Sequence, residues 1–489
     1  MTKVLFSEKG TITTLVLIFG GIFLFLFSGL TGFILTQLKE SRQKAAWHQA
    51  LTIAEAGLNY YRWHLAHAPE DFQDGESWCC ASPPCSSCGP YEHDYVDPEG
   101  GIIGKFSLEI EAAQQCGQTA AITITSTGWS KDFPQTKRTV RAKYIQPSVA
   151  NYAYLLNDNV WAGADREIKG PYHSNGGIRM DGENKSLVTS AKEDWTCTDS
   201  FGCSTCPDQC WIEEGNCVCP GVFTTANGNE ELFDFPVPPF DFEGITMDLA
   251  QIKDLTQNQG QGIYLAPSEE KGYHLILKND RTIDVYKITD LDSLYSYNEE
   301  EGWHWEDSVI GHETFVSTYT LPENCGLVFV EDNLWIEGEV KGKVTIVSAD
   351  LINPNQETDI WLEGNIEYTT RDGSDGLVLV SQHNNLIGLN VPDNMELDGI
   401  YIAQTGRFGR NHYDCAWYWP ECKRNYLEIF GSVVSNGRVG TKWSYTGGGW
   451  ASGFEKRENI YDPQQSYSPP PFLPTVSEEH ELNEWEEVE

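Results

Sequence analysis

The sequence predicts a long membrane-spanning helix that carries a small α+β head and is followed by a large, mainly β domain. An uninterrupted apolar stretch from Thr11 to Leu38 indicates the helix. Composition indicates the β structure, because 45 glycines, 12% aromatic residues and only 4 methionines are typical of β-rich domains rather than helical bundles. Fourteen cysteines, most of them clustered, indicate an oxidising compartment outside the cytosol.

The apolar stretch is long enough to cross a bilayer. Its 28 residues contain no ionisable side chain, and a helix that rises about 1.5 Å per residue outreaches a hydrocarbon core of about 30 Å. A cleaved signal peptide is the alternative, but its apolar region is only about 7–15 residues long. We therefore expect a single-pass membrane anchor whose partner is membrane lipid.

The helix is expected to continue beyond the membrane to residue 67. After the span, apolar residues recur at i, i+3 and i+4, and no proline interrupts before Pro69. We predict one helix over 11–67, preceded by a short polar leader over 1–10. The apolar positions that define its packing face are Ala46, Ala50, Leu51, Ala54, Leu58, Tyr61 and Leu65.

Three features of this region occur together: a short leader that ends in Gly10, the long apolar helix, and the stretch Ala54-Glu55-Ala56-Gly57-Leu58. Together they resemble the N-terminus of type IV pilus minor pilins of the PilX type. The resemblance implies a pilin-like head, cleavage by a prepilin peptidase between Gly10 and Thr11, and packing of the helix against other pilin-like subunits. Major pilins carry glutamate at the fifth position after the cut, where this chain has Leu15; minor and tip subunits tend to lack it.

The head is predicted to occupy residues 68–148. It begins with a loop rich in cysteine and proline and continues with three runs in which apolar and polar residues alternate, at 105–111, 120–126 and 137–144. Alternation of this kind is typical of strands with one face buried. We expect a three-stranded antiparallel sheet packed on the helix.

Residues 149–475 are predicted to form a mainly β domain. Short β-branched runs are bounded by Gly, Asn and Asp turns, as at 327–330, 344–347 and 377–380. Such runs can stack as parallel rungs, which favours a right-handed parallel β-helix over a β-sandwich.

Three segments depart from this repeat. Prolines and a helix-like stretch predict an insertion over 231–312. The proline-rich stretch from Tyr461 to Pro474 is expected to lie across the surface or to cap an open end. Residues 476–489 are predicted to form an acidic, mobile tail.

The cysteines admit two interpretations, disulfides or zinc sites. Cys85–Cys88 and Cys203–Cys206 have C-x-x-C spacing, which thiolate zinc sites use. An extracytoplasmic location favours disulfides instead. Cys415–Cys422 is a predicted pair, Cys325 stands alone, and the other pairings stay open. The candidate disulfide cysteines are Cys79, Cys80, Cys85, Cys88, Cys116, Cys197, Cys203, Cys206, Cys210, Cys217, Cys219, Cys415 and Cys422.

Other candidate sites have simpler structural explanations. The stretch from Asp372 to Gly376 is interpreted as a tight turn rather than a calcium loop, because it lacks the full ligand series. His64 and His67 are expected to be a surface pair. The aromatic runs 303–305 and 416–419 either stack on sugars or a partner, if exposed, or pack internally, if buried. No cofactor, metal or catalytic motif is predicted.

The net charge of −39 disfavours nucleic acid as a partner. The first 44 residues carry five basic and two acidic side chains, so the acid lies beyond the anchor. We expect the C-terminal part to be extracytoplasmic, because long domains translocate largely regardless of flanking charge. The predicted function is non-enzymatic: a membrane-anchored surface subunit for type IV pilus assembly or adhesion to surface carbohydrate or protein. The alternative is a tethered β-helix enzyme that uses paired carboxylates on polysaccharide.

Overall fold

The computed structural model describes residues 11–69, 71–75, 88–243, 248–353, 356–445, 449–477 and 479–488. The chain divides into two compact units. The anchor unit comprises Met1–Ala112, Ile122–Tyr144 and Leu482–Glu489, and the β unit comprises Ala113–Ala121 and Ile145–Glu481. The tip of one head hairpin, around Cys116, therefore belongs to the β unit.

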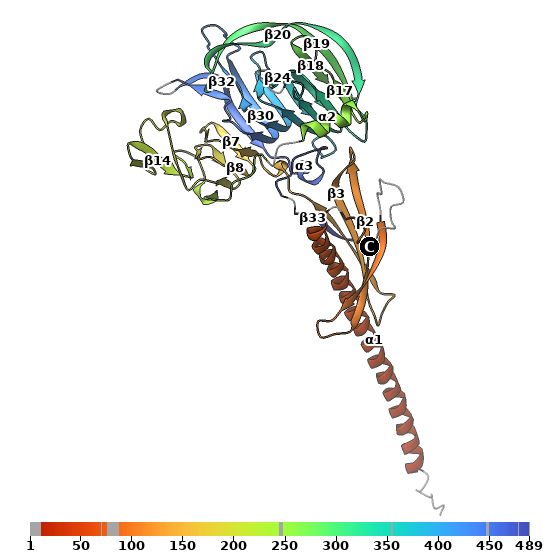
Figure 1. Ribbon diagram of the computed structural model, residues 1–489. Helices are drawn as coiled ribbons and strands as arrows, with labels where there is room; N and C mark the ends of the chain where they lie inside the picture. The colour runs from red at the N-terminus through yellow and green to blue at the C-terminus, as the bar shows by residue number, and fades with distance from the viewer. Residues whose placement is uncertain are drawn as a thin grey trace, which may run out of the picture. The chain divides into compact units, whose positions relative to one another are not determined.

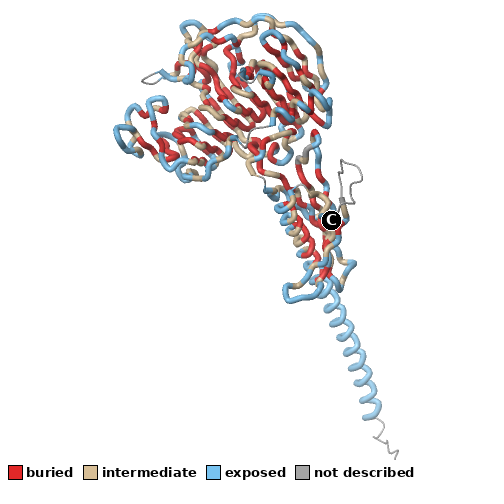
Figure 2. The backbone as a smooth tube through the Cα atoms, in the orientation of Figure 1, coloured by how far each residue is buried: buried red, intermediate tan, exposed pale blue. Residues whose placement is uncertain are grey.

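The anchor unit is built on helix α1 (Thr11–His67), which has the predicted bounds. Within the described residues it is the one helix that is long and apolar enough to cross a membrane. Its side chains are exposed through the apolar stretch, whereas Ala46, Ala50, Ile53 and Ala54 are buried farther along (Figure 2). One half of the helix is therefore free to contact lipid, and the other half packs against protein.

The packed half of α1 lies against a five-stranded sheet in the order β1-β2-β3-β4-β33. Leu58, Tyr61 and Leu65 share a core with Phe106 and Ile124 of this sheet. The three predicted strands are present with antiparallel pairing, and two further strands extend the sheet. The strands are β1 (Cys88–Val96), β2 (Ile102–Gln115), β3 (Gln118–Ser130), β4 (Lys137–Ile145) and β33 (Glu481–Val488).

Strand β33 corrects the prediction of a mobile acidic tail. Its acidic sequence has no apolar period, but β4 supplies basic partners for it. Arg138 pairs with Glu487, and Arg141 Nη1 lies 3.0 Å from Glu486 Oε1. The basic residues that pair with β33 lie more than 300 residues earlier in the sequence. A local sequence pattern therefore does not reveal this strand.

Small residues allow α1 to approach the sheet closely. A Cβ on Gly57 would lie 2.3 Å from Ser126 Oγ, and one on Gly128 would lie 2.3 Å from Ala54 N and 2.4 Å from Ala50 O. The latter two atoms belong to the helix backbone and cannot rotate away. Gly128 and Ala54 therefore set the distance between helix and sheet.

Substitution Gly128→Ala is expected to destabilise the anchor unit by about 1–3 kcal/mol, because an added methyl forces helix and sheet apart. Thermal unfolding of the full chain in detergent micelles, followed by circular dichroism, measures the effect. Gly440→Ala is the matched control, since a Cβ there meets no heavy atom within 4 Å. Equal shifts in the two variants would contradict the close-approach argument.

The β unit contains two long parallel ladders. The first runs through ten strands and joins β30 directly to β5, so the beginning of the domain pairs with its end. Its strands, in ladder order, are β17 (Ile263–Leu265), β21 (Leu327–Val330), β23 (Lys343–Ser348), β25 (Gly376–Ser381), β27 (Asn394–Ala403), β30 (Lys423–Ser435), β5 (Tyr154–Leu156), β8 (Tyr172–Ser174), β11 (Val188–Ser190) and β16 (Phe233–Asp234).

The second ladder is also parallel and shares the first halves of β27 and β30. Its other strands are β18 (Gly272–Leu277), β22 (Leu334–Val340), β24 (Ile360–Tyr368), β32 (Trp450–Ile460), β7 (Arg166–Lys169) and β10 (Glu183–Asn184). Shorter parallel sets are β24 with β26 (Asn385–Ile387) and β28 (Phe408–Gly409), and β6 (Val160–Ala162) with β9 (Ile178–Met180) and β15 (Val222–Phe223).

The first ladder is buried on both faces, which explains its continuous apolar runs. In β25, Leu377 and Leu379 enter one core, whereas Val378 and Val380 enter a second. The second core is closed by α2 (Leu249–Gln257) and by the proline-rich C-terminal segment through Phe472 and Leu473. That segment contains α3 (Gln464–Tyr467) and packs on the second core, so the first of its two predicted placements, across the domain, is the one observed.

The predicted insertion over 231–312 has different bounds in the structure. β17 and β18 lie inside it but continue the two ladders. The element that departs from the ladders is the antiparallel hairpin of β19 (Thr282–Asn298) and β20 (Gly302–Thr320), drawn in green in Figure 1. Pro236, Pro238 and Pro239 interrupt the repeat before α2, and this break obscured its resumption at β17.

The hairpin β19–β20 covers the outer face of the second ladder. Ile288, Leu291 and Ile310 of the hairpin pack with Trp335 and Trp361 of the ladder. The remaining elements are β12 (Asp194–Thr196), β13 (Trp211–Glu213), β14 (Asn216–Pro220), β29 (His412–Tyr413), β31 (Lys442–Ser444), and the 3₁₀ turns Val149–Asn151, Asp199–Phe201 and Glu230–Leu232.

Candidate functional site

The helix motif faces the sheet of its own unit. Ala54, Gly57 and Leu58 are buried there, and Glu55 and Ala56 are half-buried. Within this chain the motif therefore packs α1 on the head. Gly10 and the side chain of Thr11, which flank the predicted cleavage point, lie outside the described residues.

The described cysteines form five disulfides. Cys415–Cys422 has the predicted pairing, and three more bonds staple the lobe over 194–219: Cys197–Cys203, Cys206–Cys217 and Cys210–Cys219. The fifth joins Cys116 to Cys325 and corrects the expectation that Cys325 stands alone. These two cysteines are 209 residues apart, so their spacing in the sequence does not indicate that they pair. Cys79, Cys80, Cys85 and the side chain of Cys88 lie outside the described residues.

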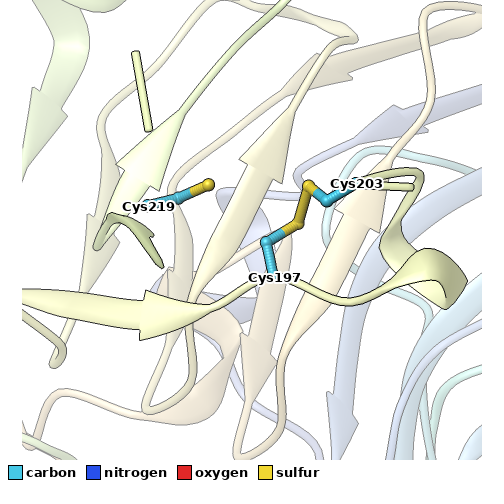
Figure 3. Close-up of side chains that lie close together, drawn as sticks. All are labelled: Cys197, Cys203 and Cys219. Carbon is cyan, nitrogen blue, oxygen red and sulfur yellow. A yellow bond between two sulfur atoms is a disulfide. The ribbon is translucent and has the colours of Figure 1, made fainter. Parts of the chain in front are cut away.

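The stapled lobe also bears on the zinc alternative. The sulfurs of Cys197, Cys203 and Cys219 lie within 4.8 Å of one another, and Figure 3 shows Cys219 beside the bond that joins the other two. Each of these sulfurs is in a disulfide, Cys219 with Cys210. Zinc requires thiolates, which oxidised sulfurs do not provide. For these cysteines the disulfide prediction is confirmed.

The turn at Asp372–Gly376 uses its carboxylates internally. Asp372 Oδ1 accepts hydrogen bonds from Ser374 N (2.9 Å) and Thr370 Oγ1 (3.0 Å). Asp375 accepts from Thr370 N (2.8 Å) and Gly342 N (2.7 Å). Burial raises the pKa of Asp375, but hydrogen bonds from Thr369, Gly342 and Thr370 outweigh it and hold that pKa below its ordinary value. The prediction of a tight turn is confirmed.

The histidines of α1 have separate partners. His64 Nε2 lies 3.1 Å from Asp71 Oδ2, and His67 Nδ1 lies 2.8 Å from Trp63 O. They do not converge on a common point, and only His67 is exposed, whereas His64 is half-buried, so the expected surface pair is not formed.

Carboxylates do line up on consecutive strands of the second ladder. Five glutamates occupy matching register positions: Glu396, Glu428, Glu458, Glu167 and Glu183. Three basic side chains form ion pairs with the row. Arg371 Nη1 lies 2.9 Å from Glu428 Oε1, Lys169 pairs with Glu458 and Glu167, and Lys185 pairs with Glu183. The row is therefore an ion-paired surface, although five glutamates against three cations leave it a net negative charge.

Glu363 differs from that row because its Oε1 is enclosed and has no hydrogen-bond partner among the described residues. Burial, and then the charge of Glu337, raises the pKa of Glu363 to about 8. Glu337 in turn lies 3.8 Å from His274 Nε2, and His274 Nδ1 lies 2.9 Å from Glu313.

The raised pKa predicts a pH-dependent stability. Protonated Glu363 is the form that the folded chain favours, so its contribution is complete below the ordinary pKa of glutamate and is lost as pH rises through about 8. Glu363→Gln is expected to remove this loss, so that the variant keeps more of its melting temperature than the wild type between about pH 6 and pH 9. Glu455→Gln, at an exposed position, is the control. Parallel pH profiles for wild type and Glu363→Gln would contradict the assignment.

The two predicted aromatic runs are exposed. Trp303 and Trp305 are 44% and 63% exposed at the end of hairpin β19–β20, and Trp417 and Trp419 are 67% and 69% exposed on the loop closed by Cys415–Cys422. The second run is joined to β19 through Tyr418, whose hydroxyl accepts a hydrogen bond from Tyr295 N at 2.7 Å, and Tyr295 opposes Trp305 in the hairpin. This exposure fits the first of the two interpretations, stacking on sugars or a partner, which stays a prediction.

Sequence reasoning missed three rings beside these tryptophans. Tyr295, Tyr297 and Trp443 contact Trp303 or one another. Tyr295 and Tyr297 alternate along a strand, as Trp303 and Trp305 do, and this period-2 pattern was the available signal. The contact of Trp443 with Tyr297 arises only in the folded chain, so no local sequence pattern predicts it.

No protein-family model matches the sequence, and no curated protein matches it. Among solved structures, the chain is similar to the competence-associated pilin ComZ from Thermus thermophilus. The two share 12% identity with a TM-score of 0.29, over 91% of this chain and 97% of that chain.

Proposed function

We propose that this chain is a non-enzymatic, membrane-anchored, pilin-like surface protein that contributes to type IV pilus assembly or adhesion. The division of α1 carries the proposal. Its first half exposes an apolar surface with no ionisable side chain, and its second half is packed on a sheet of its own unit. A helix divided in this way can be held by lipid, or by equivalent helices, while the rest of the chain remains in water.

Several features support an extracytoplasmic location for the β unit. Five disulfides in the described residues require an oxidising compartment. The acidic surface keeps a large domain soluble. The resemblance of the N-terminal region to minor pilins of the PilX type adds other pilin-like subunits as partners of α1, after cleavage between Gly10 and Thr11.

We further propose that the β unit is a right-handed parallel β-helix. Strands β21 to β25 alternate between the first and second ladders along the chain, as successive turns of a coil do. Short parallel pairs such as β24–β26 and β26–β28 supply a third side. A crystal structure in which the turns wind left-handed, or do not close, would contradict this proposal.

Fractionation tests the assembly proposal. We expect the epitope-tagged chain in sheared surface material, with a mature N-terminus at Thr11. Gly10→Val is expected to retain the uncleaved chain in the membrane, whereas Gly20→Ala is the control, because a Cβ on Gly20 meets no heavy atom within 4 Å. Recovery of the wild-type chain in the soluble fraction with Met1 intact would overturn the assembly proposal.

The non-enzymatic part of the proposal has its own test. The aligned glutamates are engaged by Arg371, Lys169 and Lys185, which supports a structural role for them. Incubation of the purified chain with polysaccharides is expected to release no new reducing ends. Release that is lost on substitution of Glu428 or Glu458 would favour the enzyme alternative.

A further inference from the structure

Six rings from four strands make one aromatic surface, which we term the aromatic platform; two of the rings are exposed and four are half-buried. Tyr295 opposes Trp305, and Tyr297 opposes Trp303, in the antiparallel register of β19 and β20. Tyr297 also pairs with His412 of β29. Because residues two apart on a strand share a face, these rings point to the same side. The platform consists of Tyr295, Tyr297, Trp303, Trp305, His412 and Trp443.

The rings are in direct contact with one another. Tyr295 and Trp303 stack with centroids 5.2 Å apart and an interplanar angle of 17°. The centroid distances are 5.3 Å from Trp303 to His412 and 5.6 Å from Tyr297 to Trp443. Contacts this close leave no gap between rings in which a compact cation could be enclosed. A ligand must lie across the rings, which favours an extended, flat molecule.

The buried hydrogen bonds at this end of the hairpin lie on the face opposite the platform. The opposite face of the same strands makes the internal contacts: Glu306 accepts hydrogen bonds from Ser296 Oγ at 2.8 Å and Tyr413 Oη at 2.9 Å. Trp305 nevertheless exposes 63% of its surface. Large exposed aromatic side chains that are held rigidly are typical of binding sites, because they supply contact area with little loss of entropy.

Charge near the platform restricts the ligand. The turn between β19 and β20 carries Glu299, Glu300 and Glu301, and Asp414 follows β29 directly. These carboxylates disfavour anionic polymers, including nucleic acid and acidic polysaccharide. Arg438 neutralises Glu299. Glu301 Oε2 lies 3.2 Å from His304 Nε2, but this carboxylate is exposed and can accept further hydrogen bonds from hydroxyl groups.

We propose that the aromatic platform binds a neutral polysaccharide, with the C–H faces of its pyranose rings stacked on the tryptophan and tyrosine rings. Aromatic faces carry a partial negative charge that attracts such C–H groups. The exposed indoles of Trp417 and Trp419, on the loop that Tyr418 joins to Tyr295, extend the surface for a longer chain. The inference deepens the proposed surface function by naming a ligand class, and it rests on that function for access to the ligand.

Co-sedimentation of the purified full chain in detergent micelles tests the proposal. Microcrystalline cellulose and chitin are the neutral probes, and an insoluble pectate gel is the anionic probe. We expect retention on at least one neutral probe and none on pectate. The double variant Trp303→Ala/Trp305→Ala is expected to lose about tenfold in affinity, which corresponds to about 1.4 kcal/mol.

Trp211→Ala is the matched control, because Trp211 is 43% exposed, as Trp303 is 44% exposed, but lies in the disulfide-stapled lobe. Circular dichroism and melting temperature verify that each variant is folded. Wild-type binding by the double variant, or no wild-type retention on either neutral probe, overturns the proposal. So does self-association in analytical ultracentrifugation that the double variant loses while polysaccharide retention is absent. None of these outcomes depends on recovery in sheared material, so the ligand proposal and the assembly proposal can fail separately.

Discussion

Replacing Cys116 and Cys325 together with serine is expected to lower the free energy of unfolding of the β unit by about 2–5 kcal/mol. The bond closes a loop between residues 209 apart, so its loss increases the conformational entropy of the unfolded chain. In the folded state the pair also occupies the second core, where Cys116 is 6% and Cys325 is 7% exposed. Urea denaturation of the full chain in detergent, followed by tryptophan fluorescence, measures the loss.

The pair Cys415 and Cys422 is the control for this prediction. It closes a loop between residues only 7 apart, so the chain-entropy estimate of its contribution is smaller by about 3 kcal/mol. Under reducing conditions, which open both bonds, the difference in melting temperature between the two variants should disappear. Equal destabilisation by the two double substitutions would show that loop length does not govern the effect.

Features with a local period could be predicted from the sequence. The span at Thr11–Leu38 and the spacing from Ala46 to Leu65 predicted α1 with its observed bounds. Alternation predicted β2, β3 and β4, and β-branched runs such as Leu377–Val380 predicted stacked parallel strands. In each of these segments the spacing of the apolar residues indicates which face is buried.

Features that depend on distant partners could not be predicted. The acidic strand β33 requires Arg138 and Arg141, and Cys116 requires Cys325. The same limit applies to the aromatic platform. Trp303 and Trp305 were recognisable as an aromatic run, but the contact of Tyr297 with Trp443 arises only where four strands meet. The sequence gives the type of each residue, but the platform forms only because the fold brings residues from distant parts of the chain together.

Glu306→Leu is expected to destabilise the chain by about 3–5 kcal/mol, because a buried acceptor shared by several donors is lost. Glu306 is 9% exposed, and its carboxylate accepts hydrogen bonds from Asn411, from Tyr413 Oη at 2.9 Å and from Ser308 Oγ at 3.1 Å. Asn411 also accepts a hydrogen bond from Arg407. The substitution therefore leaves hydroxyl and amide donors unpaired and removes one of the acids near the buried guanidinium of Arg407.

Two variants separate this cause from general disruption of the hairpin. Asp307→Ala removes the next carboxylate, which is exposed and accepts a hydrogen bond from Ser293, so its effect is expected to stay within about 0.5 kcal/mol. Glu306→Gln keeps one acceptor oxygen and is expected to fall between the other two. Urea denaturation at neutral pH measures all three. If Glu306→Leu were as stable as Asp307→Ala, the hydrogen bonds of Glu306 would not stabilise this end of the hairpin. The packing of Ile288, Leu291 and Ile310 would then be its main source of stability.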